Sequence, residues 1–259
     1  MINAIISAET DNKRTTAEYL LAPDVILLVI QDGTARLLDV GGNFYTISQV
    51  GSSMLQEALR EDTTTAAHKI ATAYGANPQH IQNDLNIFLQ DLEEKHLIEK
   101  PHRTSHVFQF KKTMLSLVFF PFLGFVHASP VSVKTKMWIL LTLAYVSFRL
   151  FGWPNTVRVW QHYYQKHAKK AAMSYPEMTV KAADEAVRAI AANHLLATEC
   201  KERALSCWAF LHSVGLPAKL VVGVNLFPLT SHCWCEFEQT ILSDDKGRCE
   251  RFTPVLNYQ

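Results

Sequence analysis

The chain has 259 residues, of which 48% are hydrophobic and 19% are charged. This composition excludes collagen-like, low-complexity and disordered chains, and the length suffices for two small domains with hydrophobic cores. The formal net charge of +1 excludes a strongly basic, nonspecific nucleic-acid binder. Five cysteines are an odd number for a disulfide framework, and residues 1–16 lack the pattern of a secretory signal, so we expect a cytoplasmic protein with free thiols.

Composition divides the chain into four segments, and it predicts an α+β fold. Residues 1–20 are expected to form a flexible tail. Residues 21–100 mix strand and helix patterns, and residues 181–259 hold all five cysteines. We therefore predict two domains, joined by an apolar helical segment over residues 101–180 that packs on the second domain.

Three short strands are predicted first. Residues 24–31 form a run rich in β-branched side chains, and Asp32-Gly33 is a hairpin signal before the second run at 35–40. Gly41-Gly42 marks a turn before the third strand, Asn43–Ile47.

Three helical patterns follow these strands. Ser48 is the expected N-cap of the first, the second covers residues 63–74 and ends at Gly75, and the third covers residues 78–96. Three strands followed by three helices predict a winged-helix-like domain. The third helix carries one apolar stripe, formed by Ile81, Leu85, Phe88, Leu89 and Leu92.

A winged helix suggests DNA binding, but the acidic third helix argues against it. Asp84, Asp91, Glu93 and Glu94 would lie close to phosphates in the major groove, so we expect no nucleic-acid partner. An exposed edge strand could instead bind an extended peptide through main-chain hydrogen bonds. The alternative is a structural accessory domain whose apolar stripe is only core.

The middle segment contains two apolar stretches, Thr113–Val133 and Met137–Phe148. The first is interrupted by Pro121 and Gly124, and the second is shorter than the roughly 20 residues that a spanning helix needs. We expect buried helices and no membrane association, with a membrane hairpin or surface attachment as the alternative.

The chemistry is expected in the last segment. A helical pattern ends at Gly215, and Thr198 as its N-cap would place Cys200 in the first turn, where free N–H groups and the helix dipole stabilise a thiolate. Cys207 lies in the helix middle and is expected to be a core residue. A buried core thiol is the alternative for Cys200 as well.

Two strands, Lys219–Val224 and Ser231–Phe237, follow this helix. If the second strand forms a hairpin with residues 241–245, His232 lies opposite Asp244 or Asp245. A carboxylate would then orient a histidine that takes the proton of a thiol nucleophile. A satisfied half-buried histidine and ordinary turn aspartates are the alternative.

A zinc site is a competing interpretation of the same residues. Two observations argue against it: adjacent strand residues point to opposite faces, and no CxxC pair is present, so we predict no metal site. Its four potential ligands would be His232, Cys233, Cys235 and Cys249.

The motifs of the last segment resemble a known family. Glu199-Cys200 through Gly215, Leu220–Val224, Pro228, Ser231–Glu236 and Asp244 together are similar to the transglutaminase-like leader peptidase of lasso peptide biosynthesis, the B protein. The order of strands and helices in residues 21–100 resembles the leader-recognition domain related to the peptide chaperone of the pyrroloquinoline quinone pathway. The fold implied for residues 181–259 is papain-like.

The resemblance implies a function and roles for three residues. Cys200 is the implied nucleophile, His232 the base and later the acid, and Asp244, rather than Asp245, the residue that orients the histidine. The implied reaction removes the leader of a ribosomal precursor peptide, releasing the core peptide for a partner cyclase that resembles asparagine synthetase. A peptide-binding scaffold without catalysis and a transglutaminase-like acyltransferase are the alternatives.

The resemblance also implies where the leader binds and which cofactors are used. Nothing resembles a phosphate loop, so no cofactor is expected in this chain, and any ATP dependence would come through the partner cyclase. The leader is expected along the third strand against the third helix, at Phe44, Tyr45, Thr46, Gln82, Leu85, Phe88 and Leu89.

Overall fold

The computed structural model describes residues 3–6, 17–22, 25–100, 114, 118–126, 128–167 and 176–259. The chain forms two compact units, Met1–Ser105 and His106–Gln259. The α+β class predicted from the sequence is confirmed, because a sheet and several helices occur in each unit.

The first unit is built on a four-stranded antiparallel sheet with the order β1-β3-β4-β5. The two predicted hairpins are present, and Gly33 turns the first of them with a φ of 82°. The expectation of a flexible tail is wrong for Asn3–Ile6, which pairs with β3 in the sheet. Pairing between segments so far apart leaves no local sequence signal. The strands are β1 (Asn3–Ile6), β3 (Val25–Val29), β4 (Ala35–Asp39) and β5 (Asn43–Ile47).

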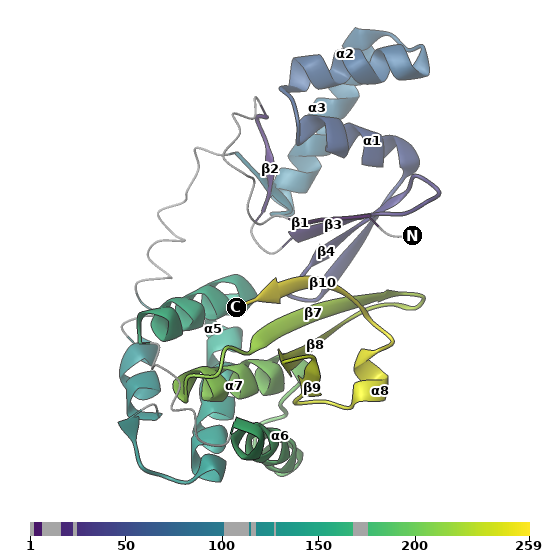
Figure 1. Ribbon diagram of the computed structural model, residues 1–259. Coiled ribbons are helices and arrows are strands. Elements are labelled where there is room, and N and C mark those ends of the chain that lie inside the picture. The colour runs from purple at the N-terminus through teal and green to yellow at the C-terminus, as the bar shows by residue number, and fades with distance from the viewer. Residues whose placement is uncertain are drawn as a thin grey trace. The chain divides into compact units, whose positions relative to one another are not determined.

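Three helices cover one face of this sheet, as Figure 1 shows. Ser48 caps the first helix and Gly75 ends the second in the left-handed conformation, so both predicted signals are confirmed. Leucines of β3, β4, α1 and α3 form the core between the two layers. The helices are α1 (Gln49–Ala58), α2 (Thr63–Tyr74) and α3 (Pro78–Glu94), and a short ladder of β2 (Leu20–Leu21) and β6 (Ile98–Glu99) joins the ends of the unit.

The second unit begins with helical residues 118–126 and contains α5 (Val133–Lys166) and α6 (Pro176–Ala192). The apolar stretch Met137–Phe148 lies in the first part of α5, as a helix, and α5 is interrupted at Gly152 (φ 74°, ψ 177°) just before Pro154. Among the described residues, α5 is the one helix that is long and apolar enough to cross a membrane, and 39% of its most apolar window is buried. Its buried side chains pack against α6 and α7 (Cys200–Ser213).

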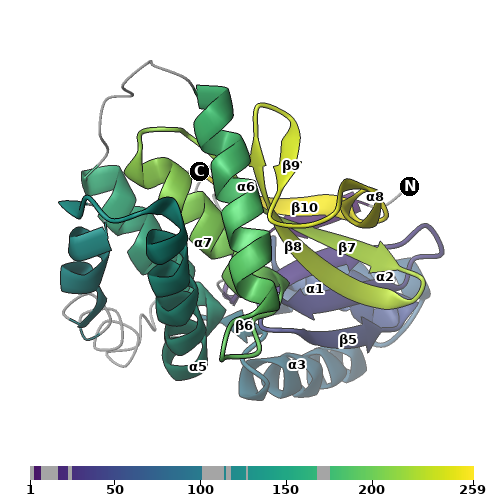
Figure 2. The ribbon, with the colours of Figure 1, turned by 90° about the horizontal axis from the view of Figure 1, so that it is seen from below.

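The sheet of the second unit has the order β10-β7-β8-β9, and all of its pairs are antiparallel. Figure 2 shows α5, α6 and α7 on one side of this sheet. The helix α7 packs directly on β8. The strands are β7 (Lys219–Leu226), β8 (Leu229–Phe237), β9 (Thr240–Leu242) and β10 (Thr253–Tyr258), and a short helix, α8 (Lys246–Cys249), precedes β10.

Candidate active site

Cys200 is the first residue of α7, in the first turn as predicted. The predicted cap is wrong, because Glu199 rather than Thr198 is the N-cap. The N–H of Glu199 donates to the carboxylate of Glu202 over 2.8 Å, and this contact closes the first turn. The thiol therefore lies among the unpaired N–H groups of a helix start, which favour a thiolate, but burial outweighs them and raises the pKa of Cys200.

The thiol of Cys200 lies at the edge of β8. The N–H of Cys235 donates to the Ser243 hydroxyl over 3.3 Å, and two residues earlier the N–H of Cys233 lies near the Cys200 thiol and favours its charged form. N–H groups two residues apart on a strand point the same way, and β9 ends at Leu242, so the edge beyond it is open to the thiol. The N-terminus of α7 and the middle of β8 thus meet at residues 200 and 233.

His232 and Asp244 are brought together in the second unit. His232 is 3% exposed and Asp244 is 8% exposed, and His232 Nε2 lies 3.1 Å from Asp244 Oδ2. The two groups are within hydrogen-bonding distance, although the Nε2 atom is not aligned for a regular hydrogen bond. Because Nε2 faces the carboxylate, Nδ1 is the ring nitrogen left to take a proton from a thiol.

The sequence correctly places a carboxylate near His232 but for the wrong reason. Extending the hairpin register would put Asp245 opposite His232, yet pairing stops at Leu242. Ser243 turns the chain with a φ of 68°, and its N–H donates to Asp184 Oδ1 of α6 over 2.7 Å. Asp244 therefore reaches the histidine from a bend and not as a cross-strand partner.

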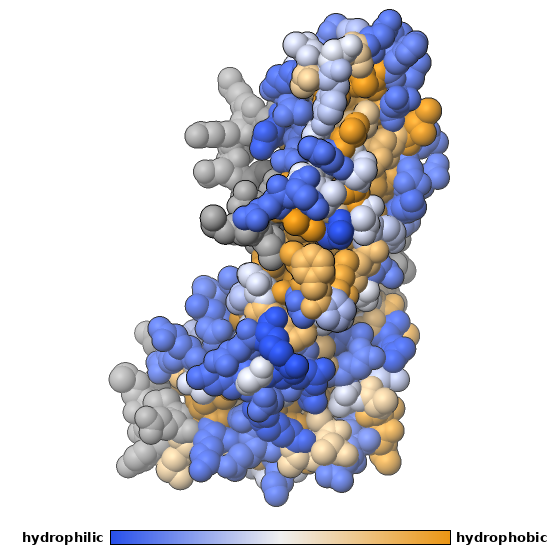
Figure 3. All heavy atoms as spheres, turned by 90° about the vertical axis from the view of Figure 1, so that its right-hand side faces the viewer, coloured by the Kyte–Doolittle hydropathy of each residue, from blue (hydrophilic) through white to orange (hydrophobic). Residues whose placement is uncertain are grey.

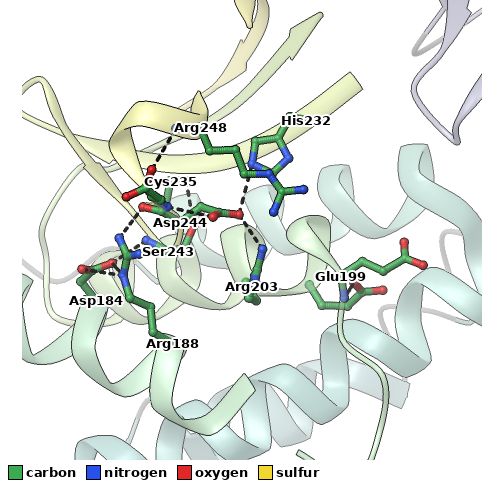
Figure 4. A network of polar contacts seen from close by, with 11 residues as sticks. Asp184, Arg188, Glu199, Arg203, His232, Cys235, Ser243, Asp244 and Arg248 are labelled. Carbon is green, nitrogen blue, oxygen red and sulfur yellow. Dashed lines mark hydrogen bonds and ion pairs between the residues drawn. The ribbon is translucent and has the colours of Figure 1, made fainter. Parts of the chain in front are cut away.

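Two arginines that sequence reasoning missed hold Asp244. Arg203 of α7 contacts Asp244 Oδ2 at 2.5 Å, and Arg188 of α6 donates to the backbone carbonyl of Asp244 while pairing with Asp184. Figure 4 shows the carboxylate between the His232 ring and the Arg203 side chain. Helical spacing was the sequence signal that could have found them. Arg203 follows Cys200 by three residues and Arg188 follows Asp184 by four, so the members of each pair lie on the same face of a helix.

Burial sets the resting charges of the thiol and the imidazole. It raises the pKa of Cys200, which the Cys233 N–H and the Arg203 charge oppose. It lowers the pKa of His232, an effect that Asp244 opposes and that the Arg248 and Arg203 charges reinforce. These directions favour a neutral thiol beside a neutral imidazole, in which the histidine serves as a general base.

The rings around His232 hold it in place. Phe252 lies 5.0 Å away between centroids, and Trp234 lies 6.3 Å away. Gly223 pairs with His232 across the sheet, and a Cβ at Gly223 would lie 2.7 Å from the Trp234 ring. Glycine at this position therefore leaves room for the indole beside the histidine.

The remaining cysteines are buried and free. Burial raises the pKa values of Cys233, Cys235 and Cys249, to about 11 for Cys249. Within the part of the chain that the structure describes, no group of three or more His, Cys, Asp or Glu side chains could hold a metal ion.

The first unit contains a groove of about 400 Å³ between β5, the start of α1, and α3. Figure 3 shows, in its upper half, a face of this unit where apolar side chains reach the surface between polar ones. Asp91 and Lys95 in the groove pair with each other at 2.6 Å, so its charges are compensated internally. The lining residues are Tyr45, Thr46, Ile47, Ser48, Val50, Gly51, Met54, Phe88, Asp91, Leu92 and Lys95.

Three of the seven residues predicted to bind the leader line this groove: Tyr45, Thr46 and Phe88. Leu85 and Leu89 are 0% and 1% exposed and belong to the core, so their assignment to a binding surface is wrong. Phe44 and Gln82 are half-buried and do not line the groove.

Comparisons with protein families give one match in each unit. Residues 24–98 match coenzyme PQQ synthesis protein D (PqqD), and residues 142–257 match the transglutaminase-like superfamily. The two matched domains, in this order, are the domain architecture of the lasso peptide B protein. No match was found among curated proteins or among solved structures.

The matches give each unit a coarse assignment. PqqD is a domain that binds precursor peptides of ribosomally synthesised, modified natural products. The transglutaminase-like superfamily has the papain-like cysteine protease fold. That match begins at residue 142, inside α5, so most of this helix lies within the matched region rather than in a separate segment before it.

Proposed function

We propose that the protein is a cysteine peptidase that binds the leader of a lasso precursor peptide and cuts it from the core peptide. The observation that carries this proposal is the contact of His232 with Asp244 at 3.1 Å, next to the place on β8 where Cys233 lies near Cys200 at the start of α7. A precursor-binding domain on the same chain supplies the substrate class.

The reaction follows from the protonation states of the site. His232 Nδ1 takes the proton of the Cys200 thiol as Sγ attacks the carbonyl carbon of the scissile bond. The core peptide leaves as a free amine with the proton that His232 held, and the leader remains as a thioester on Cys200. Water then gives a proton to His232 and its oxygen to the thioester, which releases the leader carboxylic acid and restores the thiol.

The groove of the first unit supports leader binding. The strand β5 is at the edge of the described sheet, and an extended peptide could pair with its free main-chain groups beside α3. Tethering the leader there would raise the local concentration of the scissile bond at Cys200. We further propose a cytoplasmic location and a separate asparagine-synthetase-like cyclase as partner, with any use of ATP belonging to that cyclase.

The test is cleavage of a lasso precursor peptide, taken from the same genome, by the purified full-length protein. We expect wild-type protein to give leader and core fragments whose summed mass exceeds the precursor by one water. Cys200→Ala should bind the precursor and not cut it, whereas Cys207→Ala, which removes a buried thiol of the same helix, should still cut. Cleavage by Cys200→Ala would refute the assignment of Cys200 as the nucleophile.

Two other results would redirect the proposal. A wild-type protein that binds the precursor and never cuts it, alone or with the cyclase, would support a scaffold. A leader fragment joined to an added amine, without uptake of water, would support an acyltransferase.

A further inference from the structure

Arg203 and His232 contact the same oxygen atom. Arg203 Nη2 lies 2.5 Å from Asp244 Oδ2, and His232 Nε2 lies 3.1 Å from that oxygen. The Arg203 side chain is 25% exposed and the Asp244 side chain 10%, so solvent screens this three-group contact only in part. A guanidinium bound to a carboxylate oxygen withdraws electron density from it, so this oxygen stabilises a second positive partner less strongly.

The position of Asp244 does not depend on Arg203 alone. Its other oxygen, Oδ1, accepts the N–H of Asp245 over 2.8 Å, and its backbone carbonyl accepts from Arg188. The neighbouring Ser243 N–H is held by Asp184. Removal of the Arg203 guanidinium would therefore leave the carboxylate in place and direct its charge to His232.

The charged and titratable groups that face His232 come from three elements packed around β8. They are Arg203 on α7, Arg248 on α8, and Asp244 after β9. Two cations, Arg203 and Arg248, thus lower the pKa of His232 and one carboxylate raises it. Of the two cations, only Arg203 contacts that carboxylate. Figure 4 shows the Arg248 side chain beside the imidazole.

We propose that Arg203 is a positioning residue that acts on His232 through the shared Oδ2 oxygen of Asp244, and so keeps the imidazole neutral and able to accept the Cys200 proton. An Asp244 that faced the imidazole alone would stabilise the imidazolium, which cannot serve as a base. The inference rests on the proposed peptidase function only for its kinetic readout.

The first measurement is the pKa of His232, followed by NMR of the full-length protein. Arg203→Met should raise this pKa by about one unit, the lower end of what a close carboxylate contributes. Arg203→Lys keeps the cation and should leave the pKa near the wild-type value. Circular dichroism of both variants checks the fold.

A second pair of variants separates the shared oxygen from simple charge repulsion. In an Asp244→Asn background, Arg203→Met should change the His232 pKa by less than half as much as in wild type. Arg248→Met removes a nearby cation that does not touch Asp244, and its effect should persist in the same background. A shift with Arg203→Met that is absent, runs downward or survives Asp244→Asn would overturn the proposal.

The kinetic readout is the pH dependence of kcat/KM for precursor cleavage. Arg203→Met should move the acidic limb of this profile to higher pH, together with the His232 pKa. The value of kcat/KM should then fall about tenfold at pH values below the limb and change little above it. An equal loss at every pH would indicate a merely structural role and would overturn the proposal.

Failure of the peptidase function gives a different pattern. If wild-type protein cuts no precursor, the function is wrong, but the NMR titration still tests Arg203. The rate at which iodoacetamide alkylates Cys200 depends on the protonation state of His232, because this imidazole accepts the thiol proton. We therefore expect the pH profile of alkylation to shift by as much as the His232 pKa does in the NMR titration. Alkylation profiles that coincide for wild type and Arg203→Met would count against Arg203.

Discussion

The two units present their functional residues in opposite ways. The first unit offers an open groove whose one ion pair, Asp91 with Lys95, is compensated internally. The second unit buries His232 and Asp244 and surrounds them with arginines and rings. A shallow apolar groove tolerates variation in what binds, whereas a buried charged pair loses its function when one partner is removed. We therefore expect large effects from single changes in the second unit and graded effects in the first.

The largest effect should come from Asp244→Asn. An amide can orient the imidazole but cannot compensate its positive charge, so cleavage of the precursor should fall by roughly 10²- to 10⁴-fold. The matched control is Asp245→Asn, which alters the neighbouring side chain that caps α8. If both variants cut equally well, the choice of Asp244 as the orienting carboxylate is wrong.

An intermediate effect is expected at the groove. Phe88→Asp places a charge on its apolar lining and should weaken binding of the leader by about 10- to 30-fold, measured by fluorescence anisotropy with a labelled leader peptide. The control is Ile87→Asp, which introduces the same charge on the same helix at a site that is 68% exposed and does not line the groove.

The two variants also test whether binding and chemistry are separate. Alkylation of Cys200 by iodoacetamide should be the same in Phe88→Asp, Ile87→Asp and wild type. Equal leader affinities for the two aspartate variants would remove the groove from the binding site.

Local signals predicted much of the fold of the first unit. Ser48 as a cap, Gly75 as a helix end and the turn at Gly33 each act within a few residues, so the sequence shows them directly. The pairing of Asn3–Ile6 with β3 depends on a partner some twenty residues away and had no such signal. Helical periodicity likewise found the stripe of α3, but it could not separate the buried Leu85 and Leu89 from Phe88 at the groove.

The candidate site was predictable in its members and not in its support. Cys200, His232 and Asp244 lie in recognisable motifs, and the structure brings His232 to 3.1 Å from Asp244 and Cys200 near Cys233, the next residue of β8. The contacts of Arg203 and Arg188 with Asp244 span 41 and 56 residues. Such contacts follow from how α6 and α7 pack beside the bend at Ser243, and no pattern within either helix reveals that packing.

The smallest effect expected is a loss of stability in acid that is confined to the second unit. His232 is buried there and His212 is half-buried, and removal from water lowers the pKa of each below the ordinary value of 6.5. The described histidines of the first unit, His68, His80 and His96, are exposed. A lowered pKa in the folded state means that the unfolded chain binds the proton first, so this stabilising contribution is full above pH 6.5 and is lost as the pH falls through the folded values.

Tryptophan fluorescence isolates this effect, because all five tryptophans lie in the second unit. Urea unfolding followed by tryptophan fluorescence should show a lower midpoint concentration of urea at about pH 5.5 than at about pH 7.5. A His212→Gln/His232→Gln double variant should lose most of this difference between the two midpoints. A midpoint that does not move with pH in wild type would mean that the two imidazoles titrate alike in the folded and unfolded chain. It would also remove the physical reason for treating His232 as a neutral base at rest.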